Sequence, residues 1–226
     1  MHEKWQKVLP RLYDIWEVSN QSSTDNYFKR LNRELSDESC LHKIEKIDYE
    51  LRRLDAKAWE VLKRKTLPYV TKPSSDRAYE QLFNTLNEAK GYIYLKEQEA
   101  TDIEFIDEGS DETPDISGNI QDNKWLVEVK TVRPSDEEIE YLKQTRSEFR
   151  EVIDEIPNGF KNKIQSTVDK ASRQLNTYDS TNCASKILFL IVNADICLAE
   201  TPELRDFLDT CSTPNIDVVP TLHRWF

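Results

Sequence analysis

One short segment, residues 113–130, constrains the fold more than any other part of the chain. Its sequence is TPDISGNIQDNKWLVEVK, two runs of β-forming residues separated by Asp122 and Asn123. Asp and Asn tolerate the positive φ angles of a tight two-residue turn. The segment therefore predicts an antiparallel β-hairpin with its turn at these two residues.

Alternation of side chains along the predicted hairpin separates two chemically different faces. In this register Asp115 lies opposite Lys130, and Ser117 lies opposite Glu128. The polar face carries Asp115, Ser117, Leu126, Glu128 and Lys130. The other face is apolar and is predicted to pack on the core, with Ile116, Ile120, Trp125, Val127 and Val129.

Two carboxylates and an amine on one face of a strand cost free energy to bury unless they are paired or hold a metal. One interpretation is a salt-bridged surface hairpin, in which such pairs contribute little to stability. The other is a metal site, because two hard carboxylate ligands suit Mg²⁺ or Mn²⁺. An adjacent lysine can orient a water molecule or stabilise the negative charge of a transition state.

Pro114-Asp115, twelve intervening residues and Glu128-Val129-Lys130 resemble the PD-(D/E)XK signature of the restriction-endonuclease-like nuclease superfamily. The resemblance covers about residues 76–195. It implies an αβββαβ core with a mixed sheet, and hydrolysis of phosphodiester bonds with Mg²⁺ or Mn²⁺. It also implies that Asp115, Glu128 and the backbone carbonyl of Val129 hold the metal, and that Lys130 positions the attacking water.

The elements before the hairpin follow the order of that core. Apolar spacing predicts a helix over about residues 76–97, and alternation predicts a strand over 101–106. Members of the superfamily often carry a glutamate on this first helix as a further metal or water ligand. The resemblance makes Glu88 the candidate for that role and Glu80 the alternative, while a solvated glutamate is the ordinary interpretation of either.

The elements after the hairpin also have recognisable patterns. Charged residues predict an exposed helix over about 136–154, and an apolar stripe that includes Tyr178 predicts another over 160–178. Gln174 and Tyr178 resemble the QxxxY element of RecB-type exonuclease domains. The apolar run 186–192 predicts a buried strand that pairs with the hairpin in a mixed sheet. A short helix near 201–208 and a last strand near 216–219 follow.

Residues 1–75 predict a separate helical region, with Pro10 dividing its first segment. A single long helix is expected to begin near Ser36 or Asp37. Its apolar residues follow a heptad-like spacing and comprise Ile44, Ile47, Leu51, Leu54, Ala58 and Val61. We expect this stripe to pack inside the monomer, with a homodimer through the N-terminal helices as the alternative.

Composition limits the classes of protein that the chain can belong to. A hydrophobic content of 38% with 32% charged residues is typical of a soluble globular protein, and no apolar run reaches membrane-spanning length. We therefore expect a cytoplasmic protein without a membrane partner. The four cysteines form no CxxC pair and there are three histidines, so a structural zinc site is not expected.

The net charge of −11 argues against a generic nucleic-acid binder. Its distribution is uneven, because residues 1–75 carry 15 Lys and Arg against 12 Asp and Glu, whereas residues 76–226 carry 16 against 30. The predicted carboxylate site lies in the acidic part, so contacts with a nucleic-acid backbone are expected from the N-terminal part.

These observations together predict an α+β protein with an N-terminal helical region, residues 1–75, and a nuclease-like domain, residues 76–226. The expected function is metal-dependent hydrolysis of nucleic acid, with DNA favoured over RNA. One alternative is a catalytically silent nuclease fold that binds nucleic acid or a protein partner. Another is an interaction module built on the heptad helix, in which the hairpin is only structural.

Overall fold

The computed structural model describes residues 3–19, 26–35, 37–70, 79–107, 112–135, 156–193, 202–211 and 213–223. The chain is an α+β protein with a five-stranded mixed sheet. It divides into two compact units, one of Met1–Glu99 with Ile103–Phe105 and the other of Ala100–Asp102 with Ile106–Phe226. The boundary between the two units therefore lies later in the chain than residue 75, the boundary predicted from the sequence.

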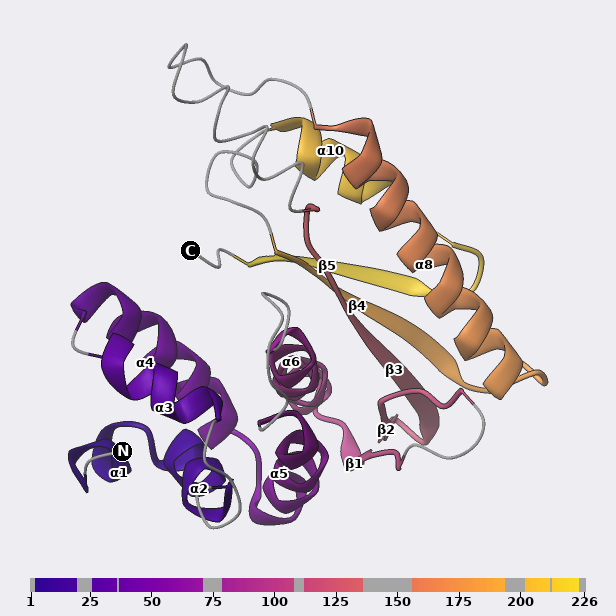
Figure 1. Cartoon of the computed structure of the whole chain (residues 1–226). Helices are drawn as coiled ribbons and strands as arrows, with labels where there is room; N and C mark the ends of the chain where they lie inside the picture. The colour runs from indigo at the N-terminus through magenta and orange to yellow at the C-terminus, as the bar shows by residue number, and fades with distance from the viewer. Residues whose placement is uncertain are drawn as a thin grey trace. The chain divides into compact units, whose positions relative to one another are not determined.

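The first unit contains the helices that precede the sheet (Figure 1). They are α1 (Glu3–Val8), α2 (Pro10–Ser19), α3 (Tyr27–Glu34), α4 (Glu38–Arg52), α5 (Ala56–Val70) and α6 (Glu80–Glu97). Pro10 separates α1 from α2, as predicted, because proline lacks an amide hydrogen and is best tolerated in the first turn of a helix.

The prediction of a single long helix after Ser36 is wrong, because the helix is interrupted between α4 and α5. Oδ1 of Asp55 accepts a hydrogen bond from the amide of Ala58 at 2.8 Å, which caps a new helix. The apolar stripe nevertheless continues through the break. Its buried members are Ile44, Ile47, Leu51, Leu54 and Ala58, and Val61 is half-buried.

The stripe allows a test of the helical packing. Leu51 on α4 is only 1% exposed, so Leu51→Ala is expected to lower the free energy of unfolding by about 2–5 kcal/mol. Tyr49→Ala on the same helix is the control, because Tyr49 is 61% exposed and surface changes cost about 0.5 kcal/mol or less. Urea denaturation of both variants measures the difference. Equal stability of the two variants would contradict the observed packing.

The sheet has the order β1-β2-β3-β4-β5. Its strands are β1 (Thr101–Phe105), β2 (Ile116–Ile120), β3 (Asn123–Val132), β4 (Ser185–Asn193) and β5 (Asp217–His223). The β2–β3 pair is antiparallel, whereas β4 is parallel to both β3 and β5. The predicted pairing of the apolar strand with the hairpin is therefore confirmed. Residues Lys186–Val192 are buried throughout, as expected for a strand covered on both faces.

The hairpin is present, but its turn lies one residue earlier than predicted. Gln121 and Asp122 have the positive φ angles of 49° and 66°, and Asn123 already belongs to β3. Ile116 consequently pairs with Val127. This register keeps every side chain on its predicted face, since residue parity is unchanged. It changes the cross-strand partners of the polar residues.

The corrected register pairs Ser117 with Leu126 instead of Glu128. Asp115 lies just before the ladder, where its amide bonds the carbonyl of Val127 and its carboxylate bonds the amide of Val129, so that its negative charge acts on Glu128. The apolar pattern could not distinguish the two registers, because both bury the same face of the hairpin.

One long helix, α8 (Asn158–Tyr178), packs on β3 and β4 (Figure 1). It covers the face of β3 that carries Leu126, Glu128 and Lys130, so this face is not the solvated one that a surface hairpin would have. The apolar cluster there includes Leu126, Val132, Phe160, Ile164, Val168, Ala171, Leu175, Leu188, Leu190 and Val192. Helix α10 (Pro202–Thr210) contributes Leu204 and Leu208. The helix expected over 136–154 lies outside the described residues.

Candidate active site

The polar side chains predicted on the hairpin converge in the second unit. Asp115 directly precedes β2, where its amide donates to the carbonyl of Val127 at 3.1 Å and its carbonyl accepts from Ile106 at 2.9 Å. Oδ2 of Asp115 accepts a hydrogen bond from the amide of Val129 at 2.7 Å. The side chain of Asp115 is thus fixed against the strand that carries Glu128 and Lys130.

Glu128 is fully buried, and two side chains contact its carboxylate. Oε2 accepts a hydrogen bond from Nε2 of Gln174 on α8 at 3.0 Å, and Oε1 forms an ion pair with the ammonium group of Lys130. Within the described part of the chain, Oε1 receives no hydrogen bond of ordinary geometry. Nε2 of Gln174 also donates to the carbonyl of Thr113 at 2.7 Å, and so ties α8 to the segment before Asp115.

The electrostatics of the site favour an added cation. Burial raises the pKa of Glu128 to about 8, and the negative charge of Asp115 acts in the same direction, while Lys130 and Gln174 act against it. Burial lowers the pKa of Lys130, but the attraction and hydrogen bond of Glu128 outweigh it and the net shift is upward. A divalent cation beside the two carboxylates would offset both their desolvation and their mutual repulsion.

The donor atoms fit a hard divalent cation. Val127 and Val129 have the same parity on β3, so the backbone groups of both face the β2 side of the strand, and the carbonyl of Val129 lies on the side of Asp115. Among the residues that the structure describes, no three His, Cys, Asp or Glu side chains are grouped to hold a metal. The set is therefore two carboxylates and a backbone oxygen, and Mg²⁺ commonly completes such a set with water.

Glu88, the fourth predicted site residue, lies on α6 in the first unit. It is 7% exposed, and its Oε2 forms an ion pair with Nζ of Lys65 on α5 at 2.6 Å. The alternative, Glu80, is half-buried at the start of α6. The participation of Glu88 in a metal site stays a prediction.

Gln174 is the site residue that the sequence analysis did not include among the functional residues. The resemblance to a QxxxY element drew attention to Gln174 and Tyr178 together, and they behave differently. Gln174 is buried against Glu128, whereas Tyr178 is 43% exposed and so does not complete the apolar stripe of α8 as predicted. The sequence did contain a signal for Gln174. It is a polar residue beside the apolar stripe of a predicted helix that follows Glu128-Val129-Lys130.

Removing the Gln174 side chain is expected to loosen the site. Gln174→Ala leaves the carbonyl of Thr113 and the buried Oε2 of Glu128 without their donor, which costs about 1–3 kcal/mol of unfolding free energy. Gln165→Ala on the same helix is the matched control, because Gln165 is exposed and bonds the exposed Asp169. Chemical denaturation compares the two. A loss no greater for Gln174→Ala than for Gln165→Ala would contradict the bridging role.

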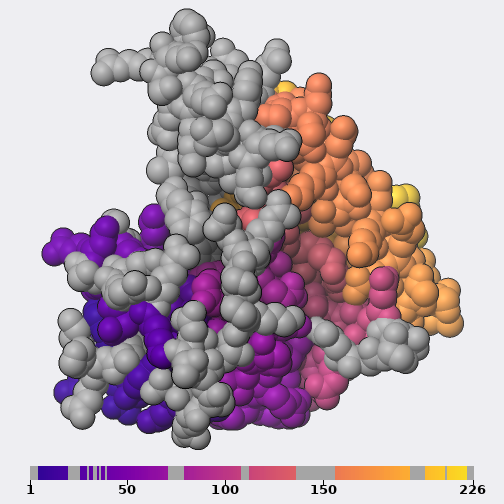
Figure 2. Space-filling model, in the orientation of Figure 1, coloured from indigo at the N-terminus to yellow at the C-terminus, as the bar shows by residue number. Residues whose placement is uncertain are grey.

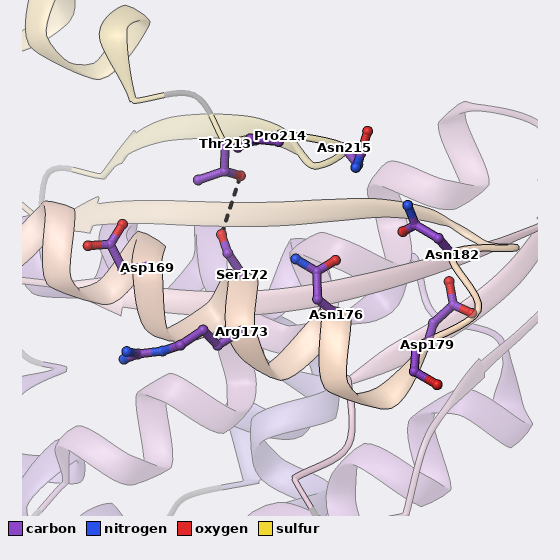
Figure 3. Close-up of a pocket in the computed structure, with 10 residues that line it drawn as sticks. Asp169, Ser172, Arg173, Asn176, Asp179, Asn182, Thr213, Pro214 and Asn215 are labelled. Carbon is purple, nitrogen blue, oxygen red and sulfur yellow. Dashed lines mark hydrogen bonds between the residues drawn. The ribbon is translucent and has the colours of Figure 1, made fainter.

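A separate hollow of about 600 Å³ lies on the other side of α8 (Figure 3). Oγ of Ser172 and Oγ1 of Thr213 lie 3.3 Å apart there. Beneath it the buried Lys186 donates to Oδ1 of Asn176 at 3.0 Å and to Oδ1 of Asn182 at 2.5 Å. The lining includes no histidine that could activate a hydroxyl group and none of the predicted site residues. The hollow is therefore separate from the predicted site.

No family model, no curated protein and no solved structure matches the chain. Within the described residues, no helix is long and apolar enough to cross a membrane.

Proposed function

We propose that this chain is a metal-dependent nuclease that hydrolyses phosphodiester bonds in nucleic acid, with DNA favoured over RNA, and that residues 76–226 are built on a restriction-endonuclease-like core. The observation that carries the proposal is the convergence at the β2–β3 hairpin of the Glu128–Lys130 ion pair with Asp115, whose carboxylate bonds the Val129 amide and whose charge acts on Glu128. The αβββαβ order of α6, β1, β2, β3, α8 and β4 supports the proposed core. A solvated surface hairpin has no need to bury Glu128 completely.

The residues of the site would have different roles in such a reaction. Asp115, Glu128 and the carbonyl of Val129 would hold Mg²⁺ or Mn²⁺. A metal bound there would supply positive charge to the phosphoryl group and lower the pKa of a water molecule. The Asp115 carboxylate is oriented by the Val129 amide, and the Glu128 carboxylate is oriented by Gln174.

Lys130 supplies the remaining positive charge. Its ammonium group lies at Glu128, where it can donate a hydrogen bond to the attacking water or to a non-bridging phosphate oxygen. In the reaction the water oxygen forms a new bond to phosphorus and its proton passes to solvent, while the bond to the leaving sugar oxygen breaks and that oxygen takes up a proton from solvent.

The test is incubation of the purified protein with supercoiled DNA, linear duplex DNA, single-stranded DNA and RNA. We expect cleavage with Mg²⁺ or Mn²⁺ and none with EDTA, and faster cleavage of DNA than of RNA. If the protein binds Mn²⁺ at these carboxylates but cleaves none of the four substrates, the chain is a silent binding module and not a nuclease.

A further inference from the structure

One flank of α8 beside the candidate site is basic. Lys163, Thr167, Lys170 and Gln174 follow spacings of four, three and four, so they share one stripe of the helix. Gln174 reaches Glu128 at one end of this stripe, and at the other end Nζ of Lys163 donates to the carbonyl of Arg133 at 2.9 Å. Both ends of the stripe are therefore in contact with β3 or the residue that follows it.

These two contacts fix how the helix and the strand are aligned. Helix α8 runs antiparallel to β3 (Figure 1). The eleven residues from Lys163 to Gln174 rise about 16 Å along a helix, and the five residues from Glu128 to Arg133 extend about 16 Å along a strand. Lys170, about 6 Å along α8 from Gln174, is consequently level with Lys130, about 7 Å along β3 from Glu128.

Within the described part of the chain, the two lysines of this flank form no ion pair with a carboxylate. Lys163 and Lys170 are exposed, and Lys163 bonds a neutral carbonyl instead of a carboxylate. On the opposite flank Lys161 forms an ion pair with Glu203. Asp169, the one acidic residue of α8, lines the hollow on that opposite side.

The outer side of α8, in orange, forms part of the surface of the second unit (Figure 2). Lys163 and Lys170 are exposed among the residues that the structure describes, so a polyanion can reach them from solvent.

We propose that Lys130, Lys163 and Lys170 form a phosphate-binding strip that holds the backbone of a nucleic-acid strand leading away from the carboxylates. This inference rests on the proposed function and deepens it. The strip spans about 10 Å from Lys170 to Lys163, which corresponds to about three phosphates along one strand at about 3.4 Å each. Recognition by charge alone does not depend on the nucleotide sequence. The strip would also provide a local positive surface for a polyanion on a chain whose net charge is −11.

The test removes the two exposed charges of the strip and two matched charges elsewhere. The variant is Lys163→Gln with Lys170→Gln, and the control is Arg173→Gln with Arg205→Gln, two exposed arginines away from the Lys163–Gln174 stripe. Fluorescence anisotropy with a labelled DNA duplex in Ca²⁺ gives the binding constant at several salt concentrations. We expect the slope of log K against log salt to become shallower by about 1.8 in the variant and to stay at the wild-type value in the control.

A small substrate separates the strip from the catalytic centre. Bis(4-nitrophenyl) phosphate is too short to reach Lys163, so the variant should hydrolyse it at the wild-type rate while DNA cleavage at moderate salt falls at least fivefold. Loss of both activities to the same extent would overturn the strip, because the lysines would then act on the reacting phosphate. The single variant Lys170→Gln, with an expected slope change of about 0.9, serves if the double variant melts at a lower temperature.

The outcomes for the strip and for the nuclease are distinct. If wild-type protein cleaves DNA and the slopes of wild type and variant coincide, the strip is overturned and the nuclease stands. If wild-type protein binds DNA without cleaving it and the slope still falls in the variant, the strip is supported and the nuclease is overturned. Absence of DNA binding by the wild type would overturn both.

Discussion

Lys130→Ala is expected to lower the rate of phosphodiester hydrolysis by about 10²–10³-fold while Mn²⁺ binding is retained. Lys130 is 31% exposed at the Glu128 carboxylate, so its ammonium group can reach both the site and an incoming substrate. Its removal takes away a donor to the transition state but leaves Asp115 and Glu128 in place. Loss of a neighbouring positive charge also favours a bound cation. Single-turnover cleavage of linear DNA and calorimetric titration with Mn²⁺ measure the two effects.

Two further variants separate the role of Lys130 from a general loss of charge. Lys124→Ala removes an exposed lysine on the same strand and face, near the hairpin turn, and should leave the rate unchanged. Lys130→Arg keeps the charge with a different shape, and should restore only part of the rate. Wild-type turnover by Lys130→Ala would show that this lysine serves the fold and not the reaction.

The hairpin shows what residue alternation can and cannot predict. The pattern from Ile116 to Val129 predicts two strands, and it places Asp115, Glu128 and Lys130 on one face. The cross-strand partners depend on whether the turn uses Gln121 or Asn123, and the apolar residues are buried equally in either register. The structure adds the position of Asp115 just before the ladder, where its bonds to Val127 and Val129 bring its negative charge close enough to act on Glu128.

The partners on α8 depend on tertiary packing. The contacts of Gln174 with Glu128 and of Lys163 with Arg133 join residues 46 and 30 positions apart. Periodicity predicts the helix and its apolar stripe, but the direction in which the helix crosses the sheet is decided by how Phe160 to Leu175 pack on β3 and β4. Only that crossing makes one polar flank of the helix part of the site.

The interruption between α4 and α5 shows why the apolar pattern alone predicted one long helix. Leu51, Leu54 and Ala58 keep a helical spacing because all three are buried, even though Leu54 lies outside both helices. The spacing of buried residues therefore matches a helix even at Leu54, which is not helical. Asp55 was the contrary signal, since its side chain caps the amide of Ala58 three residues later.

Asp115→Asn and Glu128→Gln are each expected to abolish metal-dependent stabilisation while the fold survives. Each change removes one negative charge and nearly preserves the shape of the side chain, and the amide oxygen of the introduced asparagine can still accept the bond from Val129. In wild-type protein, Mn²⁺ at about 100 times its Kd should raise the free energy of unfolding by about 2.7 kcal/mol. In either variant the same concentration should give a shift near zero. Denaturation with Mn²⁺ and with EDTA measures it.

Asp217→Asn on β5 is the control for this pair of variants, because Asp217 is exposed and loses the same charge. It should keep the full metal-dependent shift. Equal shifts in wild type, Asp115→Asn and Glu128→Gln would mean that the cation binds elsewhere, and the proposed site would be abandoned. The carboxylate variants should thus lose metal binding and turnover together, whereas Lys130→Ala should lose turnover alone. A silent binding module has no turnover to lose and cannot give this division.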